Sequence, residues 1–140
     1  MGKVWRCRRV VVDATGLGQG TASFLERSLG SGVVESFIFT AQSKSRLGFE
    51  LLAAVNGGRL KVYAADGSKE HQEFWRQIEQ AQAYYRLNRT MNFLVDPKRG
   101  HDDFLISLAL LVKAAQYAPR VARGRPGTSS HVLEPVGANR

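Results

Sequence analysis

The chain has 140 residues, and its 20 Lys and Arg against 12 Asp and Glu give a formal charge of +8. This length fits one domain and excludes a multidomain machine. Apolar residues make up 44% of the chain, which is enough for a hydrophobic core and excludes a disordered basic tail. Arginine supplies 14 of the 20 basic residues. Because a guanidinium binds phosphate oxygens at two points, the charge favours a polyanionic partner such as nucleic acid.

Compartment signals favour a cytoplasmic protein. The single cysteine, Cys7, cannot form an internal disulfide, and the first residues lack the apolar run of about 7–15 residues that a signal peptide needs. The longest apolar run, residues 104–112, is much shorter than the roughly 20 residues that cross a bilayer. We therefore expect a cytoplasmic protein that does not associate with a membrane.

The first part of the chain predicts two successive strand–helix units. Residues 4–12 end in three valines, as expected of a buried strand, and a glycine-rich loop follows Asp13. Residues 21–29 have the apolar spacing of a helix. Residues 33–40 are β-branched and aromatic, as in a strand, and residues 43–55 place leucines on one helical face.

The second part repeats this alternation. It predicts a half-exposed strand at 59–64, an amphipathic helix at 69–87, a short strand at 91–95 and an apolar helix at 101–117. Strands that alternate with helices indicate an α/β domain over residues 1–118, with a mostly parallel sheet covered on both faces. Residues 119–140 are rich in Pro, Gly, Ser and Arg and predict a flexible basic tail.

Asp13 is the first candidate functional residue. It stands where a buried strand ends, and the sites of open α/β sheets gather at the carboxyl ends of strands. The structural alternative is that its side chain only caps the turn that follows.

The loop TGLGQGT has the glycine spacing of a phosphate-binding loop, but the match is weak. The P-loop pattern is absent, and Thr21 stands where a dinucleotide-binding loop has its third glycine. Glu35 lies inside its strand, whereas the acid that holds a ribose stands at a strand end. Free nucleotide is therefore the least favoured ligand, and the alternative is that the glycines let a helix pack close to the sheet.

The sequence His101-Asp102-Asp103 is the second candidate. Two acids at the start of an apolar helix are explained by capping and by the helix dipole, although capping needs only one of them. An ionised carboxylate on a rigid helix is also a good ligand for Mg²⁺. With Asp13, the acids could hold metal between a strand end and a helix start. His101 is a ligand, a proton shuttle or a simple surface histidine.

Four basic residues are candidates for contacts with DNA. Lys44 and Arg46 open a helix, where positive charge opposes the helix dipole, so that phosphate contact would give them a purpose. The alternative is that Lys44 is simply solvated. Lys98 and Arg99 come just before the acids, where they could steer a DNA backbone toward a metal site.

Three blocks together resemble the C-terminal nuclease domain of the phage terminase large subunit. They are VVVDATGLGQG, SKSRLGFELLAAVNGGRLKV and GHDDFLISLALLVKAA, in that order, within about residues 8–117. The resemblance implies an RNase H-like fold, with a mixed sheet and helices on both faces. It also implies a metal-dependent endonuclease that cuts double-stranded DNA concatemers during genome packaging, with the portal and the small terminase as further partners.

The resemblance also implies roles for single residues. Asp13 would be the second acid of the catalytic cluster and Asp102 or Asp103 the third, around two Mg²⁺ or Mn²⁺ ions roughly 3.5–4 Å apart. Lys44 would correspond to the lysine that opens a helix in this family and places the DNA or orders the acids.

The sequence departs from the family at its beginning. The first acid, which an RNase H-like nuclease carries on an earlier strand, has no counterpart in MGKVWRCRRVVV, and the ATPase part with its Walker motif is missing. We therefore expect a terminase fragment or a prophage remnant, with weak or no cleavage by this chain alone. The alternative function is a non-catalytic DNA-binding or assembly module, in which the charge holds DNA and the acids only cap helices. A small nucleotide-binding protein is the third hypothesis.

Overall fold

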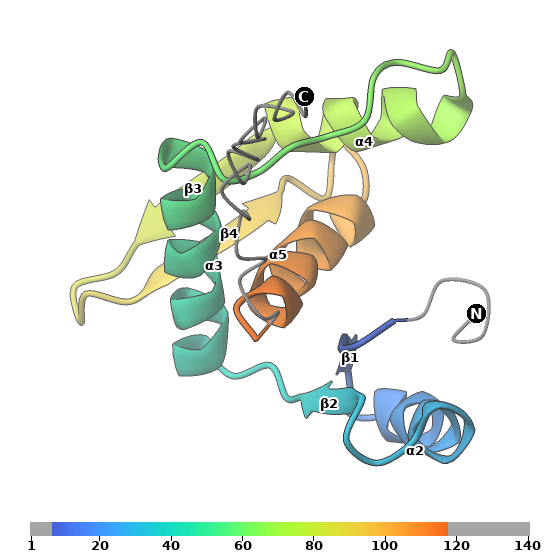
Figure 1. The fold of residues 1–140 in the computed structure, drawn as a ribbon. Helices are drawn as coiled ribbons and strands as arrows, with labels where there is room; N and C mark the ends of the chain where they lie inside the picture. The colour runs from blue at the N-terminus through green and yellow to red at the C-terminus, as the bar shows by residue number, and fades with distance from the viewer. Residues whose placement is uncertain (1–6, 118–140) are drawn as a thin grey trace, which may run out of the picture.

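The computed structural model describes residues 7–117 and confirms an α/β chain. Its elements, in chain order, are β1 (Val10–Asp13), α2 (Gly18–Leu29), β2 (Val34–Phe37), α3 (Ala41–Asn56), α4 (Lys69–Glu79), β3 (Ala81–Tyr85), β4 (Met91–Val95) and α5 (Asp103–Ala115) (Figure 1). The predicted tail at 119–140 lies outside the described residues.

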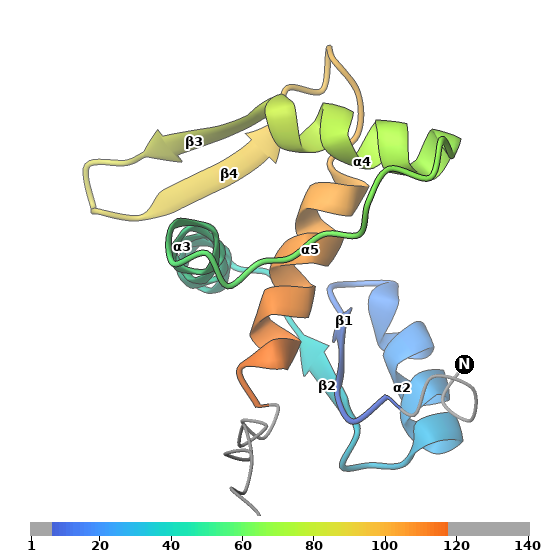
Figure 2. The same cartoon turned by 45° about the horizontal axis from the view of Figure 1, so that its top comes forward.

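The strands form two separate sheets in the described part of the chain, and not the single mostly parallel sheet that the sequence predicts. β1 and β2 pair in parallel, with Asp13 opposite Phe37, whereas β3 and β4 pair antiparallel, with Tyr85 opposite Met91. The connections explain the difference. Parallel strands need a long crossover, which α2 supplies, and the short turn between β3 and β4 permits only a hairpin (Figure 2).

Two predicted elements are wrong. Residues 59–64 form no strand, and the helix predicted over 69–87 ends at Glu79. The residues after it pair with β4, and a tight turn follows in which Asn88 Oδ1 accepts a hydrogen bond from the Thr90 N–H at 3.2 Å. Arg89 has a φ of 61°, a left-handed conformation that belongs to turns. Strand pairing and this turn override the helical spacing of the side chains.

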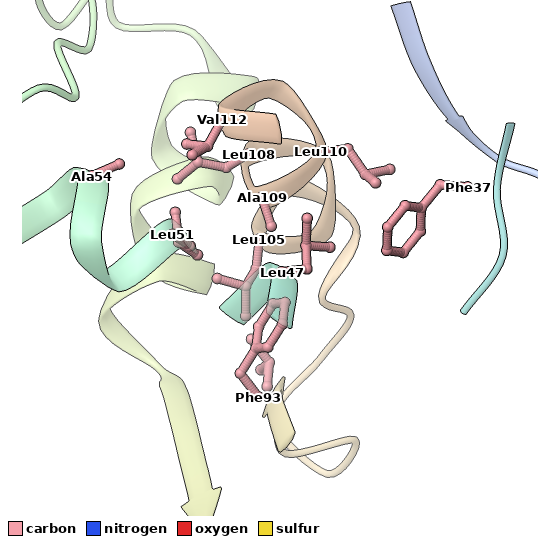
Figure 3. Packing of buried hydrophobic residues seen from close by; sticks show 11 residues of the cluster. Phe37, Leu47, Leu51, Ala54, Phe93, Leu105, Leu108, Ala109, Leu110 and Val112 are labelled. Atoms are coloured by element: carbon pink, nitrogen blue, oxygen red, sulfur yellow. The ribbon is translucent and has the colours of Figure 1, made fainter. Parts of the chain in front are cut away.

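Helix α5 lies at the centre of the fold and contacts α3, α4 and β1 (Figure 2). This position explains its almost wholly apolar sequence, because the helix is covered on several sides. Its Leu105, Leu108 and Ala109 belong to one buried cluster with Leu47 of α3 and Phe93 of β4 (Figure 3). No helix in residues 7–117 has both the length and the apolar character needed to cross a membrane.

Candidate metal and nucleic-acid site

Asp13, Asp102 and Asp103 line one groove between β1 and α5, which we call the acidic groove. It has a volume of about 430 Å³, and its other lining residues are Val11, Val12, Ile106, Ser107 and Leu110. The structure thus places the three acids that the sequence singled out along one groove, although Asp13 precedes the other two by about 90 residues in the chain. Within residues 7–117, no three His, Cys, Asp or Glu side chains lie close enough to hold one ion together. The groove therefore offers spaced carboxylates and not a closed cage.

Asp13 ends β1 and is exposed. Its Oδ1 accepts a hydrogen bond from the Thr15 N–H at 2.8 Å, so the predicted turn-capping role is present. Its second carboxylate oxygen has no hydrogen-bond partner among residues 7–117. Gly18 starts α2 so close to β1 that a Cβ there would strike the Asp13 carbonyl oxygen. Gly18 therefore permits the close packing of helix and strand that the structural alternative predicted, whereas a Cβ at Gly16 or Gly20 would meet no atom of the described residues within 4 Å.

Asp102 occupies the N-cap position of α5, but its side chain makes no capping hydrogen bond. The cap comes from α4, where Gln77 Oε1 accepts hydrogen bonds from the N–H groups of Phe104, at 2.8 Å, and Leu105, at 3.4 Å. In the described part of the chain, the carboxylates of Asp102 and Asp103 make neither a hydrogen bond nor an ion pair. The expectation that one of the acids caps the helix through its side chain is therefore wrong, and both remain free for a ligand.

Gln77 is itself held by a charged network on α4. Its Nε2 donates to Glu73 Oε1 at 2.9 Å, and Glu73 pairs with Arg76. The hydrogen bonds from Arg76 and Gln77 lower the pKa of Glu73 to about 2. Arg76 also donates to the Arg99 carbonyl at 2.7 Å, which ties α4 to the loop ahead of the acid pair.

A second groove, which we call the basic groove, lies between the start of α3 and the β3–β4 hairpin. It has a volume of about 300 Å³ and is lined by Lys44 and Arg86 together with Thr40, Thr90 and Asn92, and by no acidic side chain. The Nζ atom of Lys44 lies 5.4 Å from the centre of the Phe93 ring. Arg46 is exposed and lines a neighbouring groove that shares Thr90.

Arg86 is not among the basic residues that the sequence predicts to contact DNA, because the helical pattern places it at the end of a helix. The turn signal at Asn88 could have revealed it. Lys98 and Arg99 are exposed on the loop between β4 and α5, and neither lines the acidic or the basic groove. His101 is exposed next to the acid pair and does not line the acidic groove.

Glu35 on β2 is occupied by two ion pairs, with Arg9 at 2.7 Å and Lys113 at 3.3 Å. Burial raises the pKa of Glu35, but the hydrogen bonds and charges of these two partners outweigh it and hold the pKa below its usual value. An acid bound in this way is not available to a ribose. Arg9 and Lys113 are likewise engaged and are poor candidates for DNA contacts.

The grooves combine oxygen ligands suited to a hard divalent cation with cations suited to phosphate. Comparison with family models, with curated proteins and with solved structures found no match to this chain.

Proposed function

We propose that this chain is a metal-dependent endonuclease domain of the terminase type, RNase H-like in fold, which acts on double-stranded DNA. One observation carries the proposal. Asp13, Asp102 and Asp103 come from distant parts of the chain to line one groove, and the last two carboxylates have no other partner among residues 7–117. Metal-assisted phosphodiester hydrolysis needs carboxylate ligands for the metal and a surface that binds phosphate.

Mg²⁺ or Mn²⁺ fits the donor set of the acidic groove. Mg²⁺ prefers oxygen ligands, keeps several waters, and usually takes only one or two protein carboxylates together with substrate phosphates. One or two carboxylates are therefore enough, and Asp13 with Asp102 or Asp103 would hold it. When bound, the metal supplies an activated water and stabilises the charge of an in-line displacement at phosphorus.

The basic groove would hold the DNA backbone beside this site. The loops after β1 and β2 are hydrogen-bonded to each other, because Thr15 Oγ1 accepts a hydrogen bond from the Phe39 N–H at 2.9 Å, just ahead of Thr40 at the start of α3. In the proposed complex, Lys44 and Arg86 would bind phosphates and orient the duplex, while the acids would hold the metal.

One observation favours a second candidate, a non-catalytic DNA-binding module. An oxygen of Asp13 is already engaged by the Thr15 N–H, as expected of an acid that only shapes a turn. In that case the acids hold no metal and the protein uses its charge alone.

Calorimetric titration with Mn²⁺ separates these two functions. We expect heat of binding from the natural chain. Substitution of residues that surround a metal's own ligands typically lowers the metal affinity by about 10–100-fold. We expect Asp13→Asn and Asp102→Asn each to lower the Mn²⁺ affinity by more than this. Asp96→Asn is the control, because this acid lies outside the acidic groove and an amide oxygen can still accept the Lys98 N–H bond. No binding heat, or equal heat in the three variants, would leave only the DNA-binding module.

Cleavage of supercoiled plasmid tests the reaction itself. We expect weak nicking or none from this chain alone, because in the family it resembles a first acid precedes Asp13 on an earlier strand. Any nicking should require Mn²⁺ or Mg²⁺ and disappear in Asp13→Asn. Robust nicking would contradict the need for that first acid, and nicking that survives a chelator would contradict the metal-dependent chemistry.

A further inference from the structure

We propose that Gln77 of α4 is a positioning residue for the acid pair: its side-chain oxygen caps α5 in place of Asp102 and so leaves the Asp102 carboxylate free for a cation. The role toward metal rests on the proposed function. The exchange of caps between Asp102 and Gln77 does not depend on that function, because it follows from hydrogen bonds within the protein.

The N–H groups that an N-cap side chain normally binds already have an acceptor at the start of α5. An Asp at the N-cap normally accepts a hydrogen bond from the N–H of the second or third helical residue. In α5 these residues are Phe104 and Leu105, and the Oε1 atom of Gln77 already accepts from both. Gln77 is only 2% exposed, so water cannot compete for these donors.

Glu73 fixes which way the Gln77 amide faces. A carboxylate only accepts hydrogen bonds, so the Gln77 NH₂ group must face Glu73 and its oxygen must face α5. The low pKa of Glu73 keeps this carboxylate ionised throughout the physiological range. Gln77 therefore cannot flip and present donors to the helix start, where they would repel its N–H groups.

Removal of Gln77 should return Asp102 to the ordinary role of an N-cap residue. With Gln77→Leu, the N–H groups of Phe104 and Leu105 lose their acceptor, and Asp102, which occupies the N-cap position, is the residue placed to replace it. An Asp102 that caps the helix is held against the backbone and no longer faces the groove. A residue that only stabilises the fold would change the melting temperature without this exchange.

The test compares Asp102→Ala with Asp102→Asn in two backgrounds, by thermal unfolding in a chelator. Both substitutions remove the charge, but only Asn can cap a helix. In the natural background we expect the two variants to melt alike. In the Gln77→Leu background we expect the Asn variant to melt higher by about 3–4 °C, the shift that a helix cap of about 1 kcal/mol produces in a chain of 140 residues. An Asn variant that melts higher in the natural background would overturn the proposal, and this arm holds even if Gln77→Leu does not fold.

Rescue and metal binding complete the test. Glu73→Gln with Gln77→Glu reverses the donor and acceptor of the pair and keeps an oxygen toward α5, so the two Asp102 variants should again melt alike. In Gln77→Leu with Asp102 intact, we expect Mn²⁺ affinity to fall about 10–100-fold, as for other groups that orient metal ligands. Unchanged Mn²⁺ affinity would overturn the positioning role while the proposed function stands. Absence of Mn²⁺ binding by the natural chain would instead overturn the proposed function, and with it the role of Gln77 toward metal.

Discussion

Duplex DNA should bind this chain with an affinity that falls steeply as salt rises. Each phosphate neutralised by Lys or Arg releases condensed counterion, with a log–log slope of about −0.9 per contact, so 6–10 contacts would cost about 10³–10⁵ in affinity between 50 and 200 mM salt. Lys44→Ala and Arg86→Ala should each weaken binding at all DNA sequences and reduce the slope by about 1. Fluorescence anisotropy of a labelled duplex over a salt series measures both quantities.

Arg27→Ala is the matched control for the DNA prediction. Arg27 is an exposed arginine in the last turn of α2 and lines neither groove, so its removal lowers the net charge by the same unit. If DNA binding depends on the basic groove, Arg27→Ala should leave the slope almost unchanged. Equal losses of DNA affinity in Lys44→Ala, Arg86→Ala and Arg27→Ala would show that net charge alone attracts DNA. An affinity that is independent of salt would contradict a phosphate-dominated interface.

Leu47→Ala should cost about 2–5 kcal/mol of unfolding free energy, because it opens a cavity where α3, β4 and α5 meet. Leu47 is 1% exposed and belongs to the buried cluster around α5. Leu52→Ala, in the same helix but at a position 37% exposed, should cost much less. Urea denaturation followed by circular dichroism measures the two losses.

Comparable losses at Leu47 and Leu52 would contradict a core organised on α5. The core around α5 also affects the site, because α5 carries Asp102 and Asp103 at its first turn and the same core sets the distance of this turn from β1. A loosened core should therefore also weaken Mn²⁺ binding, even though Leu47 does not line the acidic groove.

Local patterns predicted the first half of the fold well. The valine run before Asp13 and the glycines after it led to a strand, a loop and a helix, all of which the structure contains. The sequence also singled out the acids that line the acidic groove, because strand ends and helix starts carry recognisable residue types. The apolar periodicity after Glu79 led to a wrong prediction of a continued helix. Amphipathic spacing does not show that a tight turn allows residues 81–85 to pair with β4 instead.

The cap on α5 could not be predicted from the sequence. Asp102 has the residue type and position of an N-cap, and the local pattern therefore favours capping by its own side chain. Gln77 precedes it by 25 residues and reaches the helix start only through the packing of α4 against α5. Whether an acid is free for a ligand depends on such tertiary contacts, which no local spacing reveals.

Paramagnetic broadening of amide signals by Mn²⁺ tests most directly whether the acidic groove holds a metal. A bound Mn²⁺ ion broadens the NMR signals of nearby amides and leaves distant ones sharp. We expect selective broadening at the end of β1, around Asp13, and at the first turn of α5, around Asp102 and Asp103, while the hairpin turn near Leu87 stays sharp. Broadening centred on Glu73 and Glu70 of α4, or spread evenly over the exposed acids, would contradict a metal site at this groove.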